Sequence, residues 1–263
     1  QARDLGVVKD ANPLSQITPE YLGEKLDSET LDFGEDWLRL TCNIPARGSH
    51  AAIPEATWDG LQVEEGIPEG EPVGVGADFA WVLDTTALVP LLVRDRNCRL
   101  FGDPEIIEPP RDGSLMKPET VKEGFRRIQA RNPIAMVVMD KTNAADIAGW
   151  LEDEMGLTVV DRTQGNKLQA LDYKRFMDGL ASRSIRHTGH KVFRRHVLNA
   201  VARKLEGDNY RFDRPSDSRR DPRRQRRRVI DGLTAAAMIH TTLCAQFYDD
   251  EEPESSGVLV GSF

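Results

Sequence analysis

The centre of the chain is a series of short apolar runs separated by turns. The first three runs span 73–80, 87–93 and 98–107. Their short connections favour an antiparallel meander of strands. A fourth run, 134–139, is continuously apolar, as is typical of a central strand covered on both faces. A short fifth strand is expected over 157–160.

Between and after these runs, apolar residues recur at helical spacing. Such spacing predicts helices that begin near Glu119, after Asn143 as a capping residue, near Lys167, near His190 and near Ile230. The helix from His190 is expected to continue to Leu205, because apolar residues recur on one face that far. Strands that alternate with helices in this order predict an α/β domain.

The two ends of the chain are less regular. Residues 1–72 are interpreted as a lead-in, with one helix start at Thr18-Pro19-Glu20 and a strand-like piece over 37–42. Its last part, 64–72, is acidic and rich in Gly and Pro, which indicates a linker. The expected organisation is therefore the lead-in, a globular domain over 73–248 and an acidic, flexible tail over 249–263.

Composition narrows the possible classes of protein. The 263 residues are 39% hydrophobic and 30% charged, which suits one large domain or two small ones with a charged surface. No apolar run approaches the roughly 18 residues of a membrane span, so no membrane partner is expected. The three cysteines are odd in number and far apart, which excludes a disulfide scaffold and a paired-cysteine zinc site and suggests a reducing compartment.

The net charge of −8 hides a strong asymmetry. Residues 1–72 carry 15 acidic against 5 basic residues, whereas 183–228 carry 16 Lys and Arg against 5 acidic residues. Such a basic block predicts a localised face that binds a polyanion, and Arg contacts phosphate with two parallel hydrogen bonds. The alternative is a solvated loop. The candidate DNA-binding residues are Arg219, Arg220, Arg223, Arg224, Arg226, Arg227 and Arg228.

Several common catalytic motifs are absent. There is no phosphate-binding P-loop, no nucleophile elbow of the G-x-S-x-G type and no H-E-x-x-H helix. The pair His187 and His190 has no cysteine or acidic partner at ligand spacing, so solvated or DNA-facing histidines are the favoured interpretation.

Three aspartates stand out by position. Asp78 lies late in the first strand, Asp140 ends the fourth, and Asp231 opens the last helix. A carboxylate beside a buried strand is costly unless it is paired or bound to a metal. If the first and fourth strands are neighbours, Asp78 and Asp140 lie side by side and repel each other, which a divalent cation relieves. The small residues after Asp231 allow that helix to lie close to the sheet, and three oxygen ligands suit Mg²⁺ or Mn²⁺.

Each aspartate also has a purely structural interpretation. Asp140 could cap a turn, although Asn143 is the better cap, and Asp231 is favourable in a first helical turn through the helix dipole alone. Asp84 is most simply a turn residue. The combination of Asp78, Asp140 and Asp231 on these elements nevertheless favours a shared site.

Five segments, in this order, resemble the nuclease domain of the large terminase subunit of tailed bacteriophages. They are Val75-Gly76-Ala77-Asp78-Phe79-Ala80, Asp84-Thr85-Thr86-Ala87-Leu88-Val89, Val137-Val138-Met139-Asp140, His196-Val197-Leu198-Asn199-Ala200 and Ile230-Asp231-Gly232-Leu233-Thr234-Ala235-Ala236. The resemblance covers about residues 73–247. It implies a ribonuclease H-like fold, with a mixed five-stranded sheet of three antiparallel strands and then two parallel ones, flanked by helices.

The resemblance also implies an activity. Asp78, Asp140 and Asp231 would be catalytic ligands of two Mg²⁺ or Mn²⁺ ions about 3.5–4 Å apart, with Asp78 bridging both ions and Asp84 a possible further ligand. The substrate would be concatemeric viral double-stranded DNA, cut during genome packaging in the host cytoplasm at the procapsid portal. The implied partners are a packaging ATPase domain, the portal and the small terminase subunit. Full-length members carry the ATPase at the N-terminus. That half is therefore expected to be a separate chain or to have been removed, unless the chain is a degraded relative.

Two other functions remain open from the sequence. The chain could be a different ribonuclease H-like nuclease, such as a junction resolvase or a transposase-like enzyme, which would prefer branched over linear DNA. It could also be a non-catalytic DNA-docking module of the packaging machine, which would not nick plasmid DNA.

Overall fold

The computed structural model divides the chain into two compact units, residues 1–51 and 52–263. The residues that it describes are 4–12, 14–30, 41–42, 51–82, 84–110, 112–215 and 228–248. Within these ranges no helix has the length and apolar character that crossing a membrane requires. All three cysteines are free thiols.

The described residues of the first unit include two helices, α1 (Leu5–Asp10) and α2 (Pro19–Thr30). The predicted helix start is confirmed, because Thr18 Oγ1 accepts a hydrogen bond from the Tyr21 amide at 3.2 Å. Val8 and Leu22 are buried against each other. Most of the strand-like piece predicted over 37–42 lies outside the described residues.

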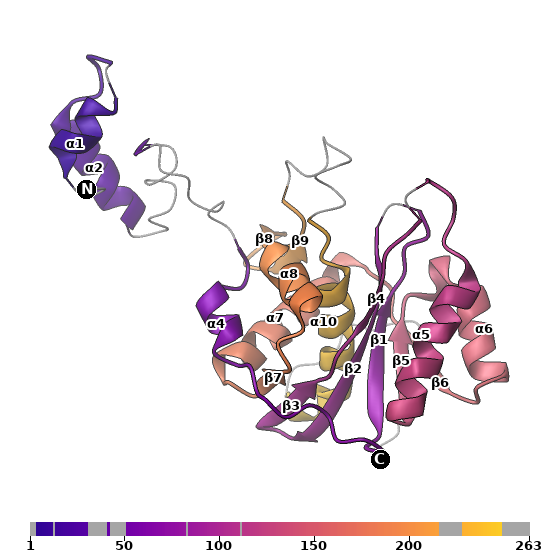
Figure 1. Ribbon diagram of the computed structural model, residues 1–263. Helices are drawn as coiled ribbons and strands as arrows, with labels where there is room; N and C mark the ends of the chain where they lie inside the picture. The colour runs from indigo at the N-terminus through magenta and orange to yellow at the C-terminus, as the bar shows by residue number, and fades with distance from the viewer. Residues whose placement is uncertain are drawn as a thin grey trace. The chain divides into compact units, whose positions relative to one another are not determined.

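The second unit is built on a seven-stranded mixed sheet (Figure 1). The strand order is β6-β5-β1-β2-β3-β7, with β4 also paired to β2. The strands are β1 (Val73–Asp78), β2 (Thr86–Asp95), β3 (Cys98–Phe101), β4 (Glu105–Ile107), β5 (Ile134–Met139), β6 (Thr158–Asp161) and β7 (Ile185–His187). β1, β2 and β3 are antiparallel, whereas β5 and β6 run parallel to β1. The predicted order of three antiparallel strands and then two parallel ones is therefore confirmed, and β4 and β7 extend it.

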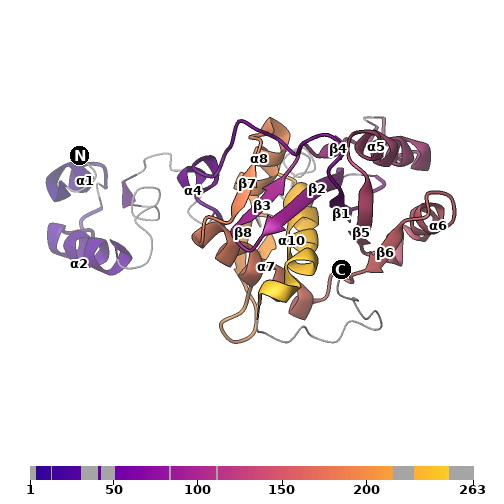
Figure 2. The ribbon, with the colours of Figure 1, turned by 90° about the horizontal axis from the view of Figure 1, so that it is seen from below.

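Helices cover both faces of this sheet (Figures 1 and 2). They are α4 (Glu55–Asp59), α5 (Pro118–Arg131), α6 (Ala145–Asp153), α7 (Asn166–Ala181), α8 (Lys191–Asn199) and α10 (Asp231–Leu243). α5 and α6 lie on one face, and α7, α8 and α10 on the other. A two-stranded hairpin, β8 (Val201–Lys204) with β9 (Tyr210–Asp213), follows α8.

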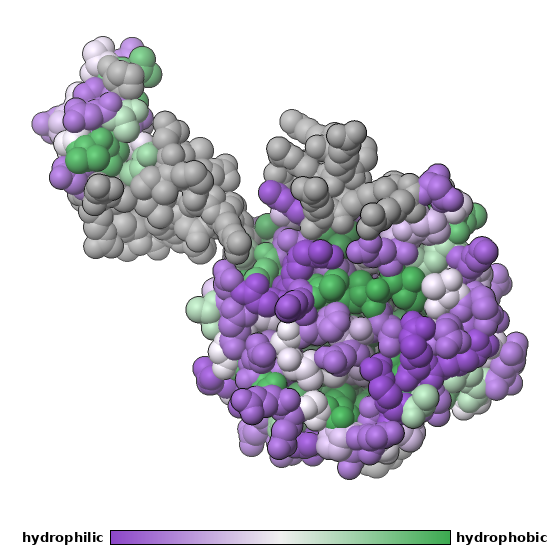
Figure 3. Space-filling model, in the orientation of Figure 1, coloured by the Kyte–Doolittle hydropathy of each residue, from purple (hydrophilic) through white to green (hydrophobic). Residues whose placement is uncertain are grey.

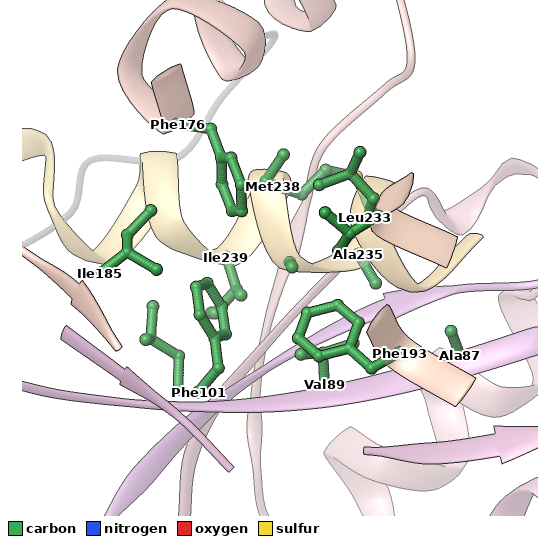
Figure 4. Close-up of a cluster of buried hydrophobic side chains, with 14 of the residues drawn as sticks. Ala87, Val89, Phe101, Phe176, Ile185, Phe193, Leu233, Ala235, Met238 and Ile239 are labelled. Carbon is green, nitrogen blue, oxygen red and sulfur yellow. The ribbon is translucent and has the colours of Figure 1, made fainter. Parts of the chain in front are cut away.

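The alternation of side chains along β1 explains the two layers. Val73, Val75 and Ala77 belong to the core cluster under α5 and α6. Gly74 and Gly76 point the other way, because successive residues of a strand face opposite sides. The core on that side, between the sheet and α10, is dominated by aromatic and branched side chains (Figure 4).

Helix α10 lies unusually close to β1. A Cβ atom placed on Gly76 would be 2.0 Å from the carbonyl oxygen of Ala235, and one on Gly74 would be 2.6 Å from the Leu243 side chain. Glycines on the strand and alanines on the helix together allow this approach. The prediction that small residues bring the Asp231 helix onto the sheet is confirmed.

The third apolar run forms two strands rather than one. β3 pairs with the second half of β2 and β4 with its first half. The break falls at Gly102, whose N–H donates to the Pro90 carbonyl at 3.0 Å, and Pro104 has no N–H to continue a ladder. The expectation of a single strand over 98–107 is therefore wrong.

The helix predicted from His190 to Leu205 also ends early, at Asn199. Ala200 is extended, with φ −70° and ψ 141°. Its carbonyl accepts a hydrogen bond from the Ala52 N–H at 2.8 Å, so the chain continues as β8 instead. A long-range partner thus overrides the local helical spacing.

Ala52, Ile53, Trp58 and Leu61 are part of the core, so the second unit begins well before the predicted boundary at residue 73. Ile53 and Trp58 are fully buried. The Trp58 ring stacks on the His187 imidazole with centroids 4.0 Å apart. His187 is therefore a buried core residue, which corrects its interpretation as solvated or DNA-facing. The predicted tail, 249–263, lies outside the described residues. Much of the visible surface of the second unit is hydrophilic (Figure 3).

The buried His240 makes the stability of this unit depend on pH. Arg99 Nη1 lies 2.9 Å from its Nε2, and because arginine only donates, the ring is neutral with its proton on Nδ1. Burial lowers the pKa of His240 to about 3, from 6.5. The unfolded chain therefore binds more protons between these two values, and stability is lost as the pH falls from 6.5 towards 3.

We expect His240→Gln to flatten this dependence by about 1.4 kcal/mol per pH unit, the contribution of one proton. Urea unfolding of both proteins at several pH values between 4 and 7 gives the two slopes. Equal slopes would contradict the neutral, buried state of His240.

Candidate active site

The ends of β1 and β5 bring Asp78 and Asp140 together. The two strands are parallel neighbours, with Ala77 opposite Met139, so the residues that follow this pair emerge at the same edge of the sheet. Gln164 links the two carboxylates. Its Nε2 donates to Asp78 Oδ1 at 2.9 Å, and its backbone N–H donates to Asp140 Oδ2 at 3.3 Å.

A pocket of about 160 Å³ opens at this edge. It is lined by Ala77, Asp78, Phe79, Asp140 and Gln164. The sequence thus correctly predicted that Asp78 and Asp140 are neighbours.

Asp140 caps a turn, which was its structural interpretation from the sequence. Its Oδ1 accepts from the Thr142 N–H at 2.9 Å and caps a short 3-10 turn over Lys141–Asn143. The N-cap residue of α6 is Ala144, and no side chain caps that helix, so the expected Asn143 cap is wrong. Asp140 therefore uses one carboxylate oxygen for the turn while the other accepts from Gln164.

Asp231 is the first residue of α10 and is buried. Its Oδ2 accepts two hydrogen bonds from Thr85, one from the backbone N–H at 3.0 Å and one from Oγ1 at 2.6 Å. Its Oδ1 accepts from Arg214 Nη2 at 2.6 Å. The other terminal nitrogen of Arg214 lies 2.7 Å from Asp84 Oδ1, so one guanidinium bridges two of the predicted carboxylates.

Residues of the fourth resembling segment hold the start of α10 in place. His196 Nδ1 accepts from the Gly232 N–H at 3.0 Å. Asn199 Nδ2 donates to the Val229 carbonyl at 3.1 Å. These two contacts lie on either side of Asp231, so α8 fixes the backbone that presents this carboxylate.

The carboxylates influence one another electrostatically. Burial, and to a smaller extent the Asp231 and Asp84 carboxylates, raise the pKa of Asp78 to about 7, against the opposing effects of Gln164 and Arg214. Burial also raises the pKa of Asp231, against the Arg214 charge and the Thr85 hydrogen bonds. Asp78 and Asp231 are therefore close enough to repel each other, and this end of the sheet favours a positive charge.

The donor set fits a hard divalent cation. Aspartate oxygens are the ligands that Mg²⁺ and Mn²⁺ prefer, and a cation relieves repulsion between buried carboxylates. Asp78, Asp140 and Asp231 would hold such ions, with Asp84 beside Asp231. Across the described residues, however, no three His, Cys, Asp or Glu side chains are arranged as ready ligands. Arg214, Thr85 and Gln164 contact the carboxylates instead.

The sequence did not indicate that Arg214, Thr85 and Gln164 contact these carboxylates. The predicted DNA-binding arginines lie outside the described residues, except for Arg228, which is half-buried shortly before α10.

No protein-family model matches the chain, and no curated protein matches it either. Several solved structures are similar to it. The large terminase of bacteriophage HK97 aligns with a TM-score of 0.59 at 18% identity, over 92% of this chain and 55% of that one. The large terminase nuclease of the thermophilic phage G20c aligns with a TM-score of 0.54 at 12% identity, over 73% of this chain and 98% of that one.

Two further structures of the G20c nuclease hold magnesium and cobalt, with TM-scores of 0.53 and 0.52. The resemblance inferred from the sequence is thus confirmed at the level of the fold, which is that of the ribonuclease H-like terminase nucleases. The chain spans about half the length of the HK97 large terminase.

Proposed function

We propose that this protein is a metal-dependent endonuclease that cuts double-stranded viral DNA during genome packaging. The observation that carries the proposal is the meeting of Asp78 and Asp140 at a pocket, beside a helix that presents Asp231. The terminase nuclease fold supports the same activity, since one structural relative is itself a nuclease with bound magnesium.

The residues divide the work of phosphodiester cleavage between them. Asp78, Asp140 and Asp231 would hold two divalent ions, which when bound activate water and stabilise the leaving 3′ oxygen. Thr85 orients Asp231 through two hydrogen bonds, and Gln164 orients Asp78 and Asp140. Rigid placement of these carboxylates fixes where the scissile phosphate can sit.

The proposed setting is the packaging machine of a tailed phage, in the host cytoplasm at the portal. Double-stranded DNA, a packaging ATPase domain, the portal and the small terminase subunit are the proposed partners. The chain spans 55% of the HK97 large terminase. The packaging ATPase is proposed to lie outside the residues described above.

The proposal is tested by incubating the purified protein with supercoiled plasmid in Mn²⁺ and in EDTA. We expect conversion to nicked and linear forms in Mn²⁺ alone. No conversion at any Mn²⁺ concentration would favour the DNA-docking module. A parallel comparison of a linear duplex with a four-way junction identifies a resolvase, which would cut the junction much faster.

A second prediction concerns the arginine-rich segment. We expect Ala substitution of Arg223, Arg224, Arg226 and Arg227 together to weaken duplex binding to a similar extent for unrelated sequences, because phosphate contacts carry no sequence information. The salt dependence should flatten by a slope of about 0.9 per lost phosphate contact. Fluorescence anisotropy at several salt concentrations measures both. An unchanged affinity and slope would indicate a solvated loop or a protein-docking segment.

A further inference from the structure

Arg214 lies between two carboxylates of the candidate site and contacts both. Nη1 is 2.7 Å from Asp84 Oδ1, and Nη2 is 2.6 Å from Asp231 Oδ1. The Arg214 side chain is 19% exposed, and that of Asp231 is 6% exposed. Since each terminal nitrogen takes a different carboxylate, the guanidinium spans the gap between them.

The contact covers the oxygen of Asp231 that a cation needs. Oδ2 already accepts two hydrogen bonds from Thr85, which fill its two lone pairs. Oδ1 is therefore the oxygen left for a metal ion, and Arg214 occupies it. Arg214 takes one of the two lone pairs of Oδ1 and holds a positive charge beside the other, so a divalent cation that binds this oxygen is repelled unless the guanidinium moves away.

The other side of the site is different. Asp78 and Asp140 receive hydrogen bonds from Gln164, whose amide groups carry no net charge. An ion that binds between Asp78 and Asp140 does not have to displace a cation.

We propose that Arg214 is a built-in cation that a second divalent ion must displace before Asp84 and Asp231 can bind metal. The inference rests on the proposed function, because it assumes that these carboxylates bind metal at all. It makes metal binding a two-step process, with a first ion at Asp78 and Asp140 and a weaker second ion at Asp231. Arg214 thereby raises the concentration of divalent ion that is needed to fill the second position.

The rival explanation is that Arg214 only ties the end of β9 to α10. A structural tie predicts that its removal lowers the melting temperature and leaves the metal affinity unchanged or weaker. Competition between Arg214 and the metal predicts a higher metal affinity when Arg214 is removed, because one of two competing cations is then absent.

The experiment is calorimetric titration of Mn²⁺ into the full chain without DNA, which reads metal binding and not activity. Arg214→Ala is compared with wild type and with Arg211→Ala. Arg211 is a matched control, because it lies on β9, three residues before Arg214, and its guanidinium donates to Asn166 and Gln169 instead of the site. Arg214→Lys retains the charge but has a single ammonium group, and it serves if the Ala variant does not fold.

We expect the second Mn²⁺ to bind Arg214→Ala roughly 10-fold more tightly or better, within the usual range of coupling between two ligands. Arg214→Lys should show a smaller gain in the same direction, and Arg211→Ala should stay within about twofold of wild type. The gain in melting temperature on Mn²⁺ addition should also be larger in Arg214→Ala than in wild type.

Equal or weaker second-site affinity in both Arg214 variants overturns the inference and leaves the proposed function intact. An equal gain in Arg211→Ala also overturns it, because general charge removal then explains the effect. If neither wild type nor the variants bind Mn²⁺, the inference falls together with the metal site of the proposed function.

Discussion

Asp78→Asn is expected to abolish nicking of supercoiled plasmid in Mn²⁺, with a loss on the order of 10³-fold or more, the scale seen when a catalytic group is removed. Asp78 lines the pocket, is linked to Asp140 through Gln164, and has a pKa that burial and the Asp231 carboxylate raise. An amide cannot neutralise a divalent cation as a carboxylate does. Plasmid conversion followed over time on agarose gels measures the loss.

Duplex binding should be retained or tightened in the same variant, because one source of repulsion for phosphate is removed. Asp161→Asn is the matched control. Asp161 ends the neighbouring strand β6, is exposed, and accepts from the Lys141 N–H outside the pocket lining. It should nick within a few-fold of wild type. Wild-type nicking by Asp78→Asn would remove Asp78 from the catalytic site.

Gly76→Ala is expected to prevent stable folding. The added Cβ would lie 2.0 Å from the Ala235 carbonyl oxygen and 2.8 Å from its carbonyl carbon, and both are backbone atoms that cannot rotate away. Helix α10 would have to move off β1 and carry Asp231 with it. We expect a loss of about 3 kcal/mol or more, a large part of the stability of a typical domain. Urea unfolding monitored by circular dichroism measures it.

Gly149→Ala is the matched control, since Gly149 is inside α6 and nothing lies within 4 Å of its added Cβ. Alanine in a helix interior should stabilise the protein by about 0.5–1 kcal/mol. Similar unfolding free energies for the two variants would show that α10 does not lie on β1 at this distance.

The parts of the fold that the sequence predicted depend on local pattern. The continuous run 134–139 is typical of a strand covered on both faces, and β5 is such a strand, buried at every position except Ala135. The sequence predicted that Asp78 and Asp140 lie side by side if their strands are neighbours, and β1 and β5 are parallel neighbours with both aspartates at one edge. The alanines after Asp231 indicated a close helix, and Gly76 completes the contact from the other side.

The missed features depend on contacts between distant residues. Thr85 and Asp231 are 146 positions apart, and Gln164 and Asp78 are 86 apart, so no local spacing relates them. Arg214 was visible only as one member of a basic segment, and its choice of Asp84 and Asp231 depends on where β9 ends. The early end of α8 also depends on a distant residue. The Ala52 N–H, far away in the sequence, donates to the Ala200 carbonyl just after this helix.

The most direct test of the account is anomalous diffraction from crystals of the full chain grown with Mn²⁺. We expect anomalous density within ligand distance of the Asp78 and Asp140 carboxylates. At higher Mn²⁺ we expect a second peak at Asp231, with the Arg214 side chain displaced. Manganese density only at other carboxylates, with Asp78, Asp140 and Asp231 free of metal at saturating Mn²⁺, would contradict the assignment of these residues as the catalytic site.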